Sequence, residues 1–141
     1  MDCLVKVQCD VGEGPLWDAA SQALYWIDMT NNQVFCYHLA TKKLEEWALP
    51  KNVAAVFPTA DPLILLLVLA DGLVNFHKQT QKITYLCQPE ITPGSVFNDS
   101  KQDSYGRIWA VTKASDHESK VAGLYCFTSH DQCKQLDQDY V

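Results

Sequence analysis

Long hydrophobic runs are absent from this sequence. The longest apolar stretch, Leu63 to Ala70, has eight residues, whereas a membrane-spanning helix needs about 20. The first residues, Met1 to Lys6, also lack the basic and apolar regions of a signal peptide. We therefore expect a cytoplasmic protein without a membrane partner, in which the stretch from Leu63 forms a fully buried strand.

Basic residues are scarce. The chain has 141 residues, and 11 Lys and Arg against 17 Asp and Glu give it a formal net charge of −6. A nucleic-acid-binding surface requires clustered basic residues, so nucleic acid is not an expected partner. Apolar residues at 48% and charged residues at 20% are typical of a soluble globular protein and not of a disordered one.

Cysteine pairs at metal-binding spacing are also missing. None of the six cysteines belongs to a Cys-x-x-Cys pair, so a zinc site built on cysteines is not expected. Without a secretion signal they are interpreted as free thiols, with Cys36 and Cys126 packed inside strands. His38 and His77 lack a Ser or Cys partner at the spacing of a catalytic triad. We expect both to be solvated or hydrogen-bonded, not ligands.

What the chain does contain is an internal repeat. Residues 34–44 and 73–83 align at an offset of 39 without a gap, and both have an aromatic residue followed by His. A third copy begins at Leu124, 51 residues after Leu73. Apolar strands, bounded by turn residues, precede all three copies. The repeat predicts three units, at about residues 13–50, 51–90 and 91–141.

A period near 40 residues with four short strands per unit is typical of β-propeller blades. No sustained helical period is present. A β-sandwich is the alternative, but it gives no reason for an ungapped repeat. Because three blades cannot close a ring, we predict an all-β, partial β-propeller with about three four-stranded blades.

Two segments do not recur in the repeat. The first, Gly12 to Asp18, places Glu13 between two glycines. Its composition favours a surface turn, and the alternative is a rigid strand that points Glu13 into a central channel as an oxygen ligand. The second, Val96 to Lys101, has the composition of a loop with an Asx turn. The alternative is that Asn98 and Asp99 begin a strand and bind substrate hydroxyls in the channel.

Taken together, the ordered motifs resemble the family of senescence marker protein 30 (regucalcin), the gluconolactonases and luciferin-regenerating enzyme. The resemblance is collinear and covers nearly the whole chain. It rests on Glu13-Gly14-Pro15-Leu16-Trp17-Asp18, Leu24-Tyr25-Trp26-Ile27-Asp28, Phe97-Asn98-Asp99 with Lys101, Asp103, Gly106-Arg107 and Gly123-Leu124-Tyr125.

The resemblance implies a six-bladed β-propeller of about twice this length, of which this chain would be a part, with one divalent cation in the central channel, Ca²⁺ or Zn²⁺, with Mn²⁺ and Mg²⁺ as alternatives. Family members typically open lactone rings, so a small lactone is the implied substrate. Glu13 matches a metal-binding carboxylate, Asn98 a substrate-binding amide, and Asp116 loosely an acidic substrate contact. The remaining metal ligands of the family, an Asn and an Asp that serves as base, belong beyond Val141, so the catalytic base is not identified.

One departure concerns substrate recognition, because Val96 stands where the regucalcin branch has an Arg. We expect a metal-dependent lactone hydrolase of the gluconolactonase type in the full-length form, and a weakly active or inactive portion in this chain. The alternative is a non-catalytic propeller fragment, or a half-ring that assembles with another chain through its open edges.

Overall fold

The computed structural model describes residues 3–116, 122–129 and 132–138, and in these ranges the chain forms strands, turns and bends but no helix. No helix there is long and apolar enough to cross a membrane. Twelve strands form three antiparallel sheets of four. The first contains β1 (Gly12–Asp18), β2 (Ala23–Asp28), β3 (Gln33–His38) and β4 (Lys43–Ala48); the second β5 (Val53–Pro58), β6 (Ile64–Leu69), β7 (Gly72–His77) and β8 (Ile83–Cys87); the third β9 (Ser95–Gln102), β10 (Ile108–Ala114), β11 (Gly123–Ser129) and β12 (Gln132–Gln138).

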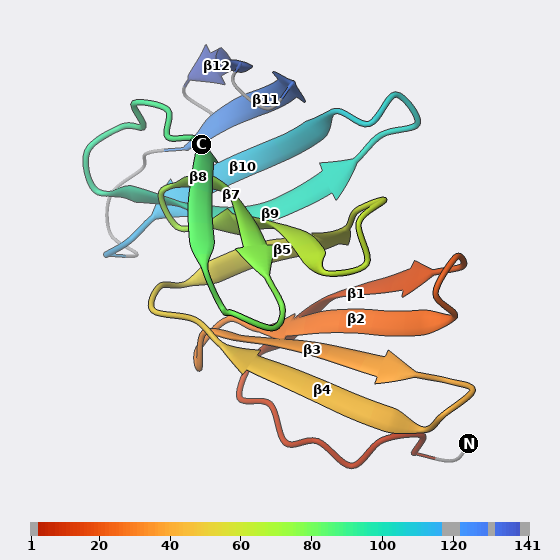
Figure 1. Cartoon of the computed structure of the whole chain (residues 1–141). Coiled ribbons are helices and arrows are strands. Elements are labelled where there is room, and N and C mark those ends of the chain that lie inside the picture. The colour runs from red at the N-terminus through yellow and green to blue at the C-terminus, as the bar shows by residue number, and fades with distance from the viewer. Residues whose placement is uncertain (1–2, 117–121, 130–131, 139–141) are drawn as a thin grey trace.

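Each sheet is a meander in which consecutive strands pair in chain order. Tight turns join them, and several turn residues have positive φ, among them Asn32 at 54°, Lys42 at 58° and Gly106 at 80°. Asn and Gly tolerate this conformation better than other residues. Figure 1 shows the innermost strands β1, β5 and β9 toward the middle of the molecule, and β4 and β12 toward its periphery.

The hydrophobic core lies between neighbouring sheets. One cluster packs Tyr25 and Ile27 of the first sheet against residues of the second, such as Leu67 and Phe76. A second cluster packs the opposite face of the second sheet, including Val68, against the third sheet; its members there are Phe97, Ile108, Ala110, Tyr125 and Phe127. Each sheet is therefore held by the burial of apolar side chains against the next one, which is the packing of propeller blades.

This architecture confirms the predicted all-β partial propeller and its four-stranded units. The stretch from Leu63 to Ala70 supplies β6, in which Leu65, Leu67, Val68 and Leu69 are buried. The expectation of full burial is wrong in part, because Leu63 is exposed and Ile64 and Leu66 are only partly buried. Cys36 and Cys126 are buried free thiols, as expected.

The readings that composition favoured for the two non-repeated segments are wrong. Gly12 to Asp18 is the whole of β1 and not a surface turn, and residues 96–101 lie within β9 and not in a loop. Both segments hydrogen-bond to the following strand of their sheet. Pairing of the backbone with that strand outweighs the weak turn preference of Gly, Pro, Asn and Asp side chains.

Candidate functional site

Each innermost strand contains an irregularity in its pairing. The register of β1 shifts between Glu13 and Leu16, and that of β5 shifts between Val53 and Ala55. In β9, Asp99 pairs with Val111 and Phe97 with Thr112, so Asn98 is the extra residue between them. β-bulges of this kind redirect side chains, and they often lie near functional sites.

Local sequence explains the bulge in β1. Gly14 has a φ of 59°, in the left-handed region that a residue with a Cβ adopts only at a cost. Pro15 follows it and has no backbone N–H to donate to the ladder, a loss that a bulge tolerates. The Gly-Pro pair thus ends regular pairing directly after Glu13.

Glu13 and Asn98 occupy strands that lie on the inner side of the first and third sheets. Glu13 is exposed and Asn98 half-buried. Within the described part of the chain, neither side chain takes part in a hydrogen bond or an ion pair with another residue. Both are therefore available to a ligand, but the structure does not join them to each other.

Asp116 lies just beyond the end of β10 and is exposed. Its neighbour Ser115 is fixed to Gly94, because the Ser115 amide and hydroxyl both donate to the Gly94 carbonyl, at 2.8 and 2.9 Å. Gly94 directly precedes β9, the strand that contains Asn98. Asp116 thus lies near the start of β9, whereas Asn98 lies in the middle of that strand. The stretch that follows Asp116, residues 117–121, lies outside the described residues.

The three innermost strands also line one depression of about 180 Å³. Its lining includes Gly14 and Pro15 of β1, Ala55 of β5 and Ser100 of β9. Ser100 is only 4% exposed, and its hydroxyl has no hydrogen-bond partner among the described residues. A buried hydroxyl without a partner is costly, so this depression can accept a polar group or a water molecule there.

The potential metal ligands around Glu13 do not complete a site for a divalent cation. Ca²⁺ takes about six to eight oxygen ligands, and catalytic Zn²⁺ about three protein ligands. Among the residues that the structure describes, Glu13 belongs to no group of three close acidic, His or Cys side chains. Among the described residues, the Glu13 carboxylate is therefore the single group that fits a cation in the channel.

Two further acidic residues of the recognised motifs have structural roles. Asp103 accepts hydrogen bonds from the Trp109 indole at 3.0 Å, from the Arg107 side chain at 2.7 Å and from the amides of Tyr105 and Arg107. The indole bond, followed by those from Arg107 and Tyr105, lowers the pKa of Asp103 to about 2. These contacts fix the β9–β10 turn, so Asp103 supports the hairpin and leaves no lone pair directed at a ligand.

Asp28 is fully buried at the end of β2. Burial alone would raise its pKa, but hydrogen bonds from the Asn31 side chain and from the amides of Asp10, Val11 and Asn31 outweigh it and lower the pKa to about 2. This carboxylate fixes the segment before β1, and thereby the start of the strand that carries Glu13.

Sequence reasoning missed one group of side chains altogether. Cys36, His38 and Glu45 place one ligand atom each within 4.8 Å of one another, on the outer strands β3 and β4. The repeat had drawn attention to His38, but nothing in the sequence identified the strand register that brings Glu45 opposite Cys36.

Comparison with known proteins identifies the class to which this fold and these motifs belong. Residues 11–141 match the sequence family described as the SMP-30/Gluconolactonase/LRE-like region. The chain belongs to this family, as the motifs predicted.

Individual relatives agree with this assignment. The chain is 30% identical to regucalcin of Danio rerio over 145 residues, covering 98% of this chain and 48% of the relative. It is 30% identical to L-arabinolactonase of Azospirillum brasilense over 103 residues, covering 73% of this chain and 34% of the relative. The crystal structure of a calcium-binding protein, regucalcin, from Agrobacterium tumefaciens superposes with a TM-score of 0.85 at 26% identity, over 96% of this chain and 46% of that one. The chain thus spans less than half the length of these relatives.

Proposed function

We propose that this chain contributes the metal-binding carboxylate and part of the substrate site of a metal-dependent sugar lactonase. The observation that carries the proposal is Glu13, an exposed carboxylate with no partner among the residues that the structure describes, at a bulge of the innermost strand in a chain of this family. One relative is named an L-arabinolactonase and another is described as calcium-binding, which supports a lactone substrate and a divalent cation.

The proposed reaction adds water to the lactone carbonyl and breaks the ring C–O bond, which yields the open hydroxy acid. A bound divalent cation would supply a Lewis acid and lower the pKa of water. Of this chain's residues, Glu13 would bind the cation through its carboxylate. The Asn98 amide would hydrogen-bond substrate hydroxyls, and Asp116 would accept from another hydroxyl. Val96 carries no charge, so recognition of the sugar relies on these polar groups.

Because Glu13 alone is a weak site, we expect this chain to bind Mn²⁺ weakly and to hydrolyse lactones slowly or not at all. The experiment follows Mn²⁺ binding by electron paramagnetic resonance and sugar-lactone hydrolysis by acid release, with Ca²⁺, Zn²⁺, Mn²⁺ or Mg²⁺ added. Glu13→Gln should abolish the binding and any metal-dependent rate. Glu46→Gln, which changes an exposed carboxylate on β4, should change neither. Equal binding by Glu13→Gln and the unchanged chain would refute the role of Glu13.

A second candidate function, a non-catalytic unit that assembles with another chain, is supported by the outer face of the third sheet. An apolar depression of about 260 Å³ there is lined by Val111, Thr112, Ala122, Gly123 and Leu124. Val111 is 40% exposed, although its strand β10 lies inside the sheet. Exposed apolar surface on a central strand favours association with a further sheet.

A further inference from the structure

A cluster of three potential ligands lies on the outer hairpin of the first sheet. Cys36 of β3 pairs directly with Glu45 of β4, and His38 lies two residues further along β3 on the same face. Cys36 is buried, and the side chains of His38 and Glu45 are each 27% exposed. Because two paired strands hold all three residues, their arrangement exists before any ligand binds.

The side chains of Cys36 and Glu45 both contact the same ring nitrogen of His38. His38 Nε2 lies 3.4 Å from Cys36 Sγ and 3.2 Å from Glu45 Oε2. A protonated Nε2 has one hydrogen to share between the sulfur and the carboxylate, and an unprotonated Nε2 directs its lone pair at a carboxylate oxygen. In a nucleophilic triad the histidine contacts the nucleophile and the acid through different ring nitrogens. Both partners of His38 contact Nε2, so the cluster is not a triad.

A metal ion satisfies all three groups at once. With Zn–S near 2.3 Å and Zn–N and Zn–O near 2.0–2.1 Å in a tetrahedron, sulfur and nitrogen ligands lie about 3.5 Å apart and nitrogen and oxygen ligands about 3.3 Å apart. The observed sulfur–nitrogen and nitrogen–oxygen separations of 3.4 and 3.2 Å agree with these values, and all three ligand atoms lie within 4.8 Å of one another. We propose that Cys36, His38 and Glu45 bind one Zn²⁺ ion, with the fourth position open to the cleft between the first and second sheets. A mixed sulfur, nitrogen and oxygen set suits Zn²⁺ and not Ca²⁺.

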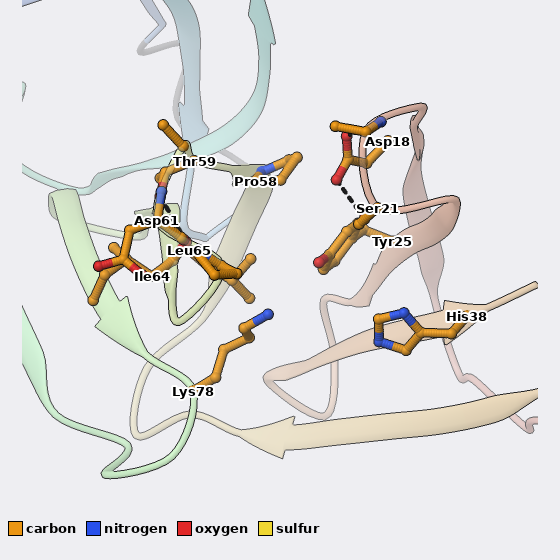
Figure 2. Close-up of a pocket in the computed structure, with 13 residues that line it drawn as sticks. Asp18, Ser21, Tyr25, His38, Pro58, Thr59, Asp61, Ile64, Leu65 and Lys78 are labelled. Carbon is orange, nitrogen blue, oxygen red and sulfur yellow. Dashed lines mark hydrogen bonds between the residues drawn. The ribbon is translucent and has the colours of Figure 1, made fainter. Parts of the chain in front are cut away.

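Of the three proposed ligands, His38 lines this cleft. The cleft has a volume of about 350 Å³, and His38 and Tyr25 line it from the first sheet while Lys78, Thr59 and Asp61 line it from the second. Figure 2 shows His38 and Tyr25 on one wall and Lys78 extending toward them from the other. A water molecule from this cleft can complete a tetrahedral coordination shell.

Neighbouring groups shift the pKa values of Glu45 and Cys36 in opposite directions. The Lys43 ammonium donates to Glu45 Oε1 at 2.6 Å, which lowers the pKa of Glu45 and leaves Oε2 for the ion. Burial raises the pKa of the Cys36 thiol, and a hydrogen bond with Tyr25 opposes that rise. Binding therefore releases the thiol proton to solvent as the Zn–S bond forms.

The second sheet has the same framework without the ligands. Asn75 pairs with Thr84 at the positions that Cys36 and Glu45 occupy in the first sheet. The histidine is retained as His77, but its Nδ1 accepts hydrogen bonds from the amides of Gln79 and Thr80, both at 3.3 Å. This histidine position can therefore serve to cap a turn, and the first sheet adds a thiol and a carboxylate that the second sheet lacks at the equivalent positions.

The test titrates the metal-free chain with Zn²⁺ against a chromophoric chelator, and with Co²⁺ while recording the thiolate-to-cobalt charge-transfer band. We expect one equivalent of Zn²⁺ to bind and the band to appear. Glu45→Gln and His38→Gln change half-exposed side chains and should weaken Zn²⁺ binding by about 100-fold or more, since loss of outer-shell partners alone costs about 10- to 100-fold. Cys36→Ser should remove the band. Circular dichroism confirms that each variant is folded.

Matched controls separate this site from others. Cys126→Ser removes another buried thiol and His77→Gln removes the equivalent histidine; neither should alter Zn²⁺ affinity or the Co²⁺ band. Absence of the band in the unchanged chain, or equal affinity in Glu45→Gln and His38→Gln, would overturn the proposal. Loss of binding in Glu13→Gln alone would place the metal in the channel and overturn it too. Since Glu13 is not a ligand here, failure of the proposed lactonase function leaves this outcome unchanged.

Discussion

Asp28 Oδ2 accepts a hydrogen bond of 2.9 Å from the Asn31 side-chain amide, and this pair closes the β2–β3 turn. The same carboxylate accepts from the amides of Asp10 at 2.9 Å and Thr30 at 3.1 Å. One fully buried acidic side chain thereby fixes two stretches of backbone that are 18 residues apart.

Asp28→Asn should lower the free energy of unfolding by about 2 kcal/mol. The substitution leaves one acceptor oxygen where there were two and removes the charge that strengthens these bonds, and each unsatisfied buried donor costs about 1–3 kcal/mol. Urea unfolding followed by circular dichroism measures the change. Asp61→Asn, at an exposed turn where Asp61 accepts from the Leu63 amide, should cost less. Equal losses for the two variants would contradict the role assigned to Asp28.

Stability should fall as the pH drops from about 4 to 2. The pKa of Asp28 in the folded chain is about 2, below its ordinary value of 3.8. Because the folded pKa is the lower one, the stabilisation is complete above the unfolded pKa and is lost as the pH falls through the folded pKa. The shift corresponds to about 2 kcal/mol.

Measuring the free energy of unfolding between pH 7 and pH 2 tests this dependence. Asp103, with a pKa also near 2, contributes in the same window, so the curve of Asp28→Asn should be flatter than that of the unchanged chain but not flat. Parallel curves for the two proteins would show that Asp28 does not titrate as described.

Gly72→Ala should destabilise the second sheet by about 3 kcal/mol. A Cβ at Gly72 would lie 2.4 Å from the Cys87 carbonyl oxygen and 3.2 Å from Gln88 Cα, so the added methyl group meets backbone that must move. Gly94→Ala is the control, because its φ is 81° but no atom lies within 4 Å of the added Cβ. It should cost about 1–2 kcal/mol, the strain of a left-handed residue. Thermal unfolding orders the two variants, and a larger loss for Gly94→Ala would refute the steric argument.

The fold could be predicted because the repeat is local in sequence. The gapless alignment of residues 34–44 with 73–83 corresponds to the β3–β4 and β7–β8 hairpins, where side chains alternate with the pleat and turn residues recur. The strands β1 and β9 were harder to predict. Their Gly, Pro, Asn and Asp residues favour turns, and only pairing with β2 and β10 makes them strands.

The candidate site residues, too, could be predicted only in part from the sequence. Glu13 and Asn98 were found through family motifs, and their roles remain predictions, since no described contact identifies their ligand. The cluster of Cys36, His38 and Glu45 was missed because a search for Cys-x-x-Cys pairs considers only residues that are close together in the sequence. A Cys-x-His pair in a strand gains its third ligand from the neighbouring strand, and sequence spacing does not define that register.

Val111→Lys should reduce self-association of the chain. Val111 is 40% exposed and pairs with Leu124 of β11, so the two side chains share the outer face of the third sheet. If a second copy covers this face, the chain should elute from a size-exclusion column as a dimer or larger species. A buried lysine without a partner opposes such an interface, and the variant should elute as a monomer. Leu44→Lys, at a residue 36% exposed on β4, should leave the elution unchanged. A monomeric unchanged chain would contradict assembly through this face, whereas equal shifts in both variants would assign the effect to added charge.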